Sequence, residues 1–210
     1  MLRYLSPSEF HAHPKLIDTM FKDRATQFKG RLDWDVSVDE HGYERDQYDR
    51  DDALYACWEL PDGTHGASMR ILSTMRAVMV NDFFSHIARQ RFCDPLIWES
   101  TRFCLSPKLK DGFQKLSAAI MLSGCEVGLN FGLKKAVAVF DPRIMRIYRQ
   151  IGWPPEVLGK EGKGREAIWV GTWEFDEKIR RDLCAKAGIA PELSQYWFDR
   201  SMRHHLAEAA

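Results

Sequence analysis

The segment DPLIWESTRF, residues 94–103, places two opposite charges inside an otherwise apolar strand pattern. Its large apolar side chains suit a packed sheet, but Glu99 and Arg102 lie among them. Burying a carboxylate or a guanidinium is costly unless each ion is paired. Side chains alternate across a strand, so these two point to opposite faces unless a β-bulge, which is common beside active sites, resets the alternation. The pattern is compatible with a structural ion pair or with a functional site.

A second group of residues that could bind a ligand lies nearer the N-terminus. Arg24 and Phe28 are four residues apart, so they share one face of a predicted helix, and Trp34 follows it. A guanidinium binds a carboxylate bidentately, and aromatic rings stack on a flat base or attract a cation. The three residues predict a clamp for a charged ligand with a flat ring. The alternative is a helix that packs its aromatic residues and exposes a solvated arginine.

Asp46 and Asp49 belong to the acidic segment ERDQYDRDD, which by itself is typical of a solvated loop. Arg70 lies in the middle of the predicted strand GASMRIL, where an unpaired charge would be costly. Arg70 therefore needs a carboxylate partner, and the acidic segment is a candidate source.

The elements that must position these residues alternate between strands and helices. We expect a short N-terminal strand, a helix to about Phe28 with Leu16 and Met20 on its buried side, and then an irregular Asp-rich segment. Two strands joined by PDG at 61–63 predict a hairpin. Further helices are expected near 78–90, 113–131, 142–151 and 175–187, and further strands near 96–105, 134–140, 156–160 and 166–173. This order predicts an α/β fold with a mixed central sheet flanked by helices.

The composition is that of a globular protein, with 210 residues, 45% of them hydrophobic and 29% charged. We expect one domain over residues 1–210. The last residues, about 12 of them, are expected to fray. A net charge of zero argues against nucleic acid and anionic membranes as partners. The charge is uneven, because residues 1–60 carry 13 acidic and 8 basic side chains, whereas residues 102–150 carry 3 acidic and 9 basic ones. This split predicts a polar partner on one side of the fold.

Other features bear on compartment and metals. The five cysteines include no C-x-x-C pair, which indicates reduced thiols in a cytoplasmic protein. We expect neither a signal peptide nor a membrane-spanning helix, since no apolar run is long enough. His11-x-His13 and His204-His205 lack clustered Cys or carboxylate partners, so no metal site is expected.

The chain resembles the acyl-homoserine-lactone synthases, the autoinducer synthases of bacterial quorum sensing, in an ordered set of residues: Arg24, Phe28, Trp34, Asp46, Asp49, Arg70, Glu99 and Arg102. The resemblance extends over roughly residues 1–175 and includes the spacing R-x3-F-x5-W-x11-D-x2-D, the strand MRIL-x-T and the segment WESTRF. Two departures are Ser73, where the family often has proline, and Thr101, where it often has serine.

The resemblance implies a fold similar to that of the N-acetyltransferases and two substrates. One is S-adenosylmethionine, and the other is an acyl chain carried as a thioester on acyl carrier protein or coenzyme A. The amine of S-adenosylmethionine attacks the thioester carbonyl. Its carboxylate then displaces methylthioadenosine and closes the homoserine lactone. No cofactor beyond the two substrates is implied.

The resemblance also implies roles for the matched residues. Glu99, in a partly dry strand end, would have a raised pKa suited to accepting a proton from the substrate ammonium, directly or through water. Asp46 and Asp49 would stabilise the ammonium and sulfonium and anchor Arg70, and Arg102 would stabilise the region of Glu99 or a substrate carboxylate. Contacts with S-adenosylmethionine are expected from Arg24, Phe28, Trp34, Phe84 and Arg102.

The acyl and carrier sites follow from the same resemblance. A backbone N–H near Ser100 is expected to stabilise the thioester oxyanion. Relatives that prefer 3-oxo chains have a threonine where Ala138 stands, so we expect an unsubstituted or 3-hydroxy chain here. The residues expected along the acyl chain are Ser100, Phe103, Met121 and Ala138. Docking of an acidic carrier protein is expected at Lys108, Lys110, Lys134, Lys135, Arg146 and Arg149.

Two alternatives stay open. A plain N-acyltransferase that uses acyl-CoA without lactonisation would share the fold, but its pyrophosphate loop, Q/R-x-x-G-x-G/A, is absent after WESTRF, where the chain reads CLSPKLKDGFQK. The pair Gly162-x-Gly164 lies elsewhere and predicts a turn. The second alternative is a sensor that only binds a ligand, but ligand binding alone would give Glu99 and the pair Asp46 and Asp49 a smaller role.

Overall fold

The computed structural model describes residues 1–109 and 111–208, without the side chains of Arg165 and of residues 204–208. Within these residues, seven strands form one sheet in the order β1-β2-β3-β4-β5-β7-β6. They are β1 (Leu2–Leu5), β2 (Leu54–Glu59), β3 (His65–Ser73), β4 (Ile97–Leu105), β5 (Lys135–Phe140), β6 (Glu156–Glu161) and β7 (Ile168–Trp173). The predicted mixed sheet is confirmed, because β4 and β5 pair in parallel while the other pairings are antiparallel.

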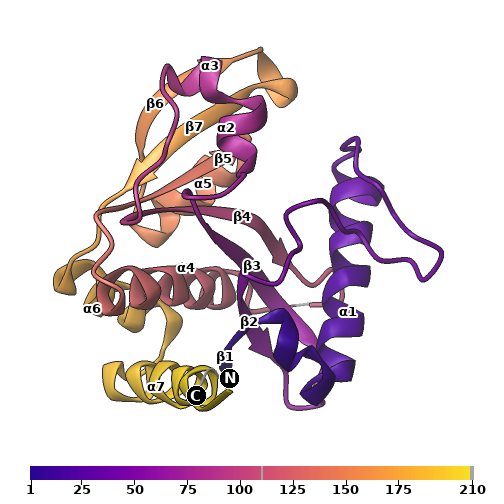
Figure 1. Cartoon of the computed structure of the whole chain (residues 1–210), viewed down its shortest axis with the longest axis vertical. Helices are drawn as coiled ribbons and strands as arrows, with labels where there is room; N and C mark the ends of the chain where they lie inside the picture. The colour runs from indigo at the N-terminus through magenta and orange to yellow at the C-terminus, as the bar shows by residue number, and fades with distance from the viewer. Residues whose placement is uncertain (110, 209–210) are drawn as a thin grey trace.

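Helices cover both faces of this sheet (Figure 1). One face packs on α1 (Pro14–Ala25), α2 (Met79–Phe83) and α3 (Ser85–Ala88). The other packs on α4 (Phe113–Asn130), α5 (Pro142–Ile151), α6 (Glu177–Ala187) and α7 (Pro191–Glu208). Leu16 and Met20 are buried beneath α1, as the sequence predicts. No helix of the part described is long and apolar enough to cross a bilayer.

Three elements differ from the sequence prediction. The first helix ends at Ala25 and continues as a π-helical turn over Thr26–Arg31. The helix expected over 78–90 is interrupted at Phe84, whose dihedral angles are not helical, and so becomes α2 and α3. Helix α7 was not predicted; Phe198 packs its ring edge-on against Tyr4 of β1, a contact that the local sequence does not reveal. Fraying of the final residues stays a prediction, since it falls partly on residues outside those described.

Strand β4 is irregular along both of its edges. It pairs with β5 only from Ile97 to Glu99, after which the two strands diverge. On the β3 side, Arg102 and Phe103 together face the single residue Met69, which is a β-bulge. Arg102 has a φ of 55°, a left-handed conformation that costs a non-glycine residue about 1–2 kcal/mol. The bulge resets the side-chain alternation and brings Arg102 to the face of the sheet on which Glu99 lies.

Candidate active site

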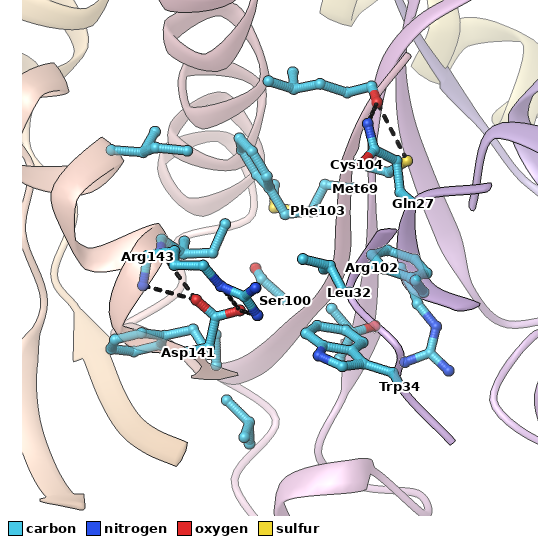
Figure 2. Close-up of a pocket in the computed structure, with 18 of the residues that line it drawn as sticks. Gln27, Leu32, Trp34, Met69, Ser100, Arg102, Phe103, Cys104, Asp141 and Arg143 are labelled. Atoms are coloured by element: carbon cyan, nitrogen blue, oxygen red, sulfur yellow. Dashed lines mark hydrogen bonds and ion pairs between the residues drawn. The ribbon is translucent and has the colours of Figure 1, made fainter. Parts of the chain in front are cut away.

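A cleft of about 1880 Å³ opens where β4 and β5 diverge. Figure 2 shows Trp34 and Arg102 on one wall and Asp141 and Arg143 on the other, with Ser100 between them. On the first wall Trp34 comes from the segment after α1 and Arg102 from β4, whereas the second wall comes from the start of α5. Pockets for one drug-sized ligand have volumes of about 300–1000 Å³. This cleft is therefore larger than a typical pocket for one such ligand.

Buried charges line or support the first wall. They form a network of three arginines and three carboxylates, Arg24, Arg70, Arg102, Glu44, Asp46 and Asp49, which we call the cleft network. Asp46 accepts hydrogen bonds from Arg70 through both oxygens, at 2.6 and 3.0 Å. Asp49 lies 2.7 Å from the same guanidinium. The predicted carboxylate partner of Arg70 in the acidic segment is confirmed.

The pKa values of the two aspartates follow from this pairing. Burial by itself raises the pKa of Asp49, but the charges of Arg24 and Arg70 outweigh it and hold that pKa well below its usual range. Burial likewise opposes ionisation of Asp46, whereas Arg70 and Arg102 lower its pKa overall. Both carboxylates are therefore ionised at neutral pH, and Asp46 offers a negative charge at the surface of the cleft.

Glu44 is a member of the network that the sequence analysis missed. Its side chain is fully buried and accepts hydrogen bonds from Arg24 at 2.7 Å and from Arg102 at 2.8 Å. A signal was present in the sequence, because Glu44 lies in the same acidic segment as the two aspartates and three interior arginines need three carboxylates.

Arg24 lies behind the wall of the cleft. Its side chain is 1% exposed, and Asp49 and Glu44 occupy its guanidinium. Contrary to the expected direct clamp on a ligand, Arg24 does not line the cleft. Its position instead orients the two carboxylates that hold Arg70 and Arg102.

The aromatic residues of the predicted clamp do line the cleft. Phe28 and Trp34 stack with ring centroids 5.1 Å apart and an interplanar angle of 5°. The guanidinium of Arg102 lies 5.5 Å from the Phe28 ring, within range of a cation–π contact. Phe84, just after α2, lines the same cleft. This wall thus combines flat rings with an arginine and an ionised carboxylate.

Glu99 is enclosed directly behind the cleft. Its side chain is fully buried, and its two oxygens accept hydrogen bonds from the backbone N–H groups of Met79 at 3.0 Å and Val80 at 2.6 Å. Burial raises the pKa of Glu99 to about 7, in spite of these two hydrogen bonds. Glu99 does not itself line the cleft, whereas Met79 and Ser100 do. Glu99 is therefore separated from the cleft by the start of α2, and a proton exchanged between them would need a bridging water or a shift of α2.

The second wall carries the ion pair of Asp141 and Arg143 together with apolar side chains. Ser100, Phe103 and Ala138 line the cleft, as predicted. Met121 does not, because it faces the core between α4 and the sheet. The sequence analysis missed several lining residues that project from β3, α4 and α5, namely Met69, Ala118, Ile144 and Ile147.

The predicted carrier-docking residues that the structure describes lie at three places in the fold. Lys134 and Lys135 stand where β5 begins, next to its paired end, and form ion pairs with Asp94 at 3.2 Å and Glu156 at 3.2 Å. The cleft opens at the other end of β5. Lys108 precedes α4, and Lys110 is outside the described residues. Arg146 and Arg149 are exposed on α5, the helix that borders the cleft.

Two remaining motifs have no part in this site. Gly162 and Gly164 lie in the connection between β6 and β7, Gly162 in a bend and Gly164 at the start of a short 3-10 helix, both with positive φ. Among the side chains that the structure describes, no three His, Cys, Asp or Glu residues come together as a metal site would require.

Comparisons with known proteins identify the family. Residues 9–183 match the family model of the autoinducer synthases. This chain belongs to the autoinducer synthase family. A curated acyl-homoserine-lactone synthase of Rhizobium etli is 36% identical over 190 residues, which cover 88% of this chain and 89% of the relative. The predicted resemblance is confirmed.

Solved structures support the same assignment at the level of the fold. The CoA-dependent acyl-homoserine lactone synthase BjaI superposes with a TM-score of 0.79 at 23% identity, over 90% of each chain. An N-acetyltransferase-like protein from Lactobacillus plantarum has a TM-score of 0.52 at 13% identity, over 83% of this chain and 99% of that one. The predicted likeness of this autoinducer synthase family member to the N-acetyltransferase fold is confirmed.

Proposed function

We propose that this chain is an acyl-homoserine-lactone synthase of the bacterial cytoplasm. It would transfer an acyl chain from a thioester to the amine of S-adenosylmethionine and then close the lactone, releasing methylthioadenosine. The observation that carries the proposal is the position of Glu99, a carboxylate with a pKa of about 7 behind a cleft whose first wall combines aromatic rings with charged side chains. BjaI, which shares the fold, was solved with S-adenosylmethionine and isopentyl-CoA.

S-adenosylmethionine would bind at the wall formed by the aromatic pair and the cleft network. The stacked rings of Phe28 and Trp34 suit an adenine base and a sulfonium cation. Asp46 would attract the ammonium group, and Arg102 the carboxylate, because both line the cleft with opposite charges. Two opposite charges on one wall match a zwitterionic amino acid and fix its orientation.

Glu99 would serve as the base of the acyl transfer. An ammonium has no lone pair for attack, so it must first lose a proton. A carboxylate with a pKa of about 7 accepts that proton near neutral pH, and because Glu99 lies behind Met79 the proton would pass through a bridging water or after a shift of α2. The nitrogen then attacks the thioester carbonyl, the C–N bond forms, and the C–S bond breaks to release the carrier thiol.

The irregular edge of β4 would stabilise the tetrahedral intermediate. Beyond Glu99, β4 no longer pairs with β5, so the backbone of Ser100 to Phe103 borders the cleft on that side. A bulge also leaves its extra residue outside the β3 ladder. Backbone N–H groups in such a position can donate to the developing oxyanion.

Lactone formation would depend mainly on positioning. The substrate carboxylate attacks the γ-carbon, the O–C bond forms, and the C–S⁺ bond breaks as methylthioadenosine departs. The sulfonium is already a good leaving group, so holding the carboxylate in line, as Arg102 could do, lowers the barrier.

The acyl chain and its carrier would occupy the second wall. Ala138 offers a methyl group and no hydroxyl, which favours an unsubstituted or 3-hydroxy chain over a 3-oxo chain. Arg146 and Arg149 on α5 would meet an acidic carrier protein at the mouth of the cleft. We expect Arg146→Glu with Arg149→Glu to slow turnover of carrier-bound substrate, whereas Lys134→Glu, far from the mouth, serves as the matched control.

Mass spectrometry of the products tests the proposed reaction. Purified protein is incubated with S-adenosylmethionine and a panel of acyl carrier protein and acyl-CoA thioesters. An acyl-homoserine lactone with an equal amount of methylthioadenosine supports the proposal and identifies the chain and the donor. An acylated amine without methylthioadenosine would show a plain N-acyltransferase. Products dominated by 3-oxo chains would contradict the argument from Ala138.

A further inference from the structure

A hydrogen bond between Tyr48 and Asp82 links the helix that covers Glu99 to the wall of the cleft. The hydroxyl of Tyr48 donates to Asp82 Oδ2 at 2.8 Å. Asp82 lies on α2, whose first two backbone N–H groups hold the carboxylate of Glu99. Tyr48 lies in the acidic segment and lines the cleft. Tyr48 therefore joins α2, the helix that covers Glu99, to the wall of the cleft.

Tyr48 itself is held in place from several sides. Its side chain is buried, its backbone N–H donates to Asp46 Oδ1 at 2.8 Å, and the guanidinium of Arg70 lies 5.7 Å from its ring. Burial, together with Asp82, raises the pKa of Tyr48, so its hydroxyl remains a donor at neutral pH. Because the ring is fixed, its hydrogen bond to Asp82 restrains the position of α2.

We propose that Tyr48 and Asp82 are positioning residues that hold α2 against Glu99 and thereby set the pH at which the enzyme gains activity. The proposal rests on the proposed function, in which Glu99 is the base. Two N–H donors stabilise the ionised carboxylate and so favour release of its proton. When α2 is held less firmly, these bonds weaken, and Glu99 keeps its proton to a higher pH.

Charges near Glu99 could produce a similar effect and must be separated from it. The titratable and charged groups on the elements packed around Glu99 are Arg70 on β3, Asp46 and Tyr48 in the acidic segment, and Asp82 on α2. On β5 its register partner is apolar. Tyr48→Phe changes none of these charges at neutral pH. Asp82→Ala removes a negative charge, which by itself would lower the pKa of Glu99.

The pH dependence of kcat/KM tests the proposal. In Tyr48→Phe we expect the acidic limb to move to higher pH by about 0.5–1 unit, the worth of a typical hydrogen bond. Asp82→Ala should move it in the same direction, opposite to the effect of charge alone. Tyr43→Phe is the matched control, because Tyr43 donates to Asp18 at 2.9 Å and does not line the cleft. Its profile should coincide with that of the unmodified protein.

Hydrogen exchange provides a readout that requires no turnover. The backbone amides of residues 79 and 80 should exchange faster in Tyr48→Phe than in Tyr43→Phe or the unmodified protein. The proposal would be overturned if the amides of residues 79 and 80 exchanged at an unchanged rate in Tyr48→Phe. It would also be overturned if the acidic limb of kcat/KM moved in neither Tyr48→Phe nor Asp82→Ala. If the unmodified protein makes no lactone, the proposed function fails, while the exchange rates still decide whether Tyr48 and Asp82 hold α2.

Discussion

Two buried clusters of charge in this protein differ in their surroundings. The cleft network pairs three arginines with three carboxylates, and part of it faces the cleft. The second cluster centres on Glu126 of α4, which is fully buried and accepts hydrogen bonds from Arg180 of α6 at 2.9 Å and Ser194 of α7 at 2.5 Å. In the part of the chain described, none of these three residues lines the cleft.

The two clusters differ in the number of charges they bury and in whether they face the cleft. One carboxylate, one arginine and one hydroxyl suffice to tie α4, α6 and α7 together. Buried ion pairs are often no more stabilising than apolar residues of the same volume, so six interlocked charges are not explained by stability alone. Two members of the cleft network, Asp46 and Arg102, line the cleft, and under the proposed function they would present charge to the substrate.

The largest effect is expected for the buried glutamate beside the cleft. Glu99→Gln keeps the size of the side chain but removes the base, so we expect turnover to fall by about 10²–10⁴-fold. The assay is the rate of methylthioadenosine release, with circular dichroism as the check on folding. Glu126→Gln is the matched control, because it changes an equally buried glutamate away from the cleft. Near-normal turnover of Glu99→Gln would remove Glu99 from the role of base.

A break in the cleft network should reduce stability and activity together. Asp49→Ala leaves Arg24 with Glu44 alone and Arg70 with Asp46 alone, so three buried arginines share two carboxylates; removal of one partner from a buried pair costs about 3–5 kcal/mol. We expect urea unfolding at a correspondingly lower midpoint and loss of binding of S-adenosylmethionine by calorimetry. A variant that unfolds like the parent would show that water, and not the network, compensates these charges.

Acid should act on the two aspartates of the network. Their pKa values are lower in the folded protein than in the unfolded chain, so their contribution is present above about pH 4 and is lost as the pH falls further. A single strongly paired carboxylate contributes on the order of 2 kcal/mol. The free energy of unfolding, measured as the pH is lowered from neutral to below 4, should decrease. In Asp49→Asn this decrease should be smaller.

Glu99 should show the opposite dependence on pH. Its pKa is about 7 in the folded protein and therefore lies above that of an unfolded glutamate. Its contribution to stability is complete below the unfolded pKa and is lost as the pH rises through 7. At pH 8 Glu99→Gln should therefore be more stable than the parent, measured by thermal unfolding. An equal or lower melting temperature would contradict the raised pKa.

The smallest effect is expected for the second cluster. In Glu126→Gln an amide oxygen still accepts hydrogen bonds from Arg180 and Ser194, so we expect a loss of about 1 kcal/mol in the free energy of unfolding. Turnover per folded molecule should match that of the parent. A strong loss of activity would mean that the two clusters are coupled through α4.

The sequence alone determined the order of strands and helices as far as α6 and the need of Arg70 for an acidic partner. Hydrophobic periodicity indicated the α/β order, and the isolated charge of Arg70 in a strand required an acidic partner, which Asp46 and Asp49 supply. The spacing of Phe28 and Trp34 anticipated an aromatic wall. These predictions succeed because burial of an unpaired charge or of apolar surface follows from residue type and local spacing.

Only the tertiary structure decided which side chains reach the cleft. The bulge turns Arg102 toward the face of Glu99, and Arg24 is enclosed where the sequence suggested direct contact. Glu44 joined the network, and Glu99 lies under two N–H groups of α2, a helix that precedes it by some twenty residues. These outcomes depend on strand register and on contacts between distant segments. Contacts between distant segments leave no periodic pattern in the sequence. A shift of strand register by one residue would also move each side chain to the opposite face of the sheet.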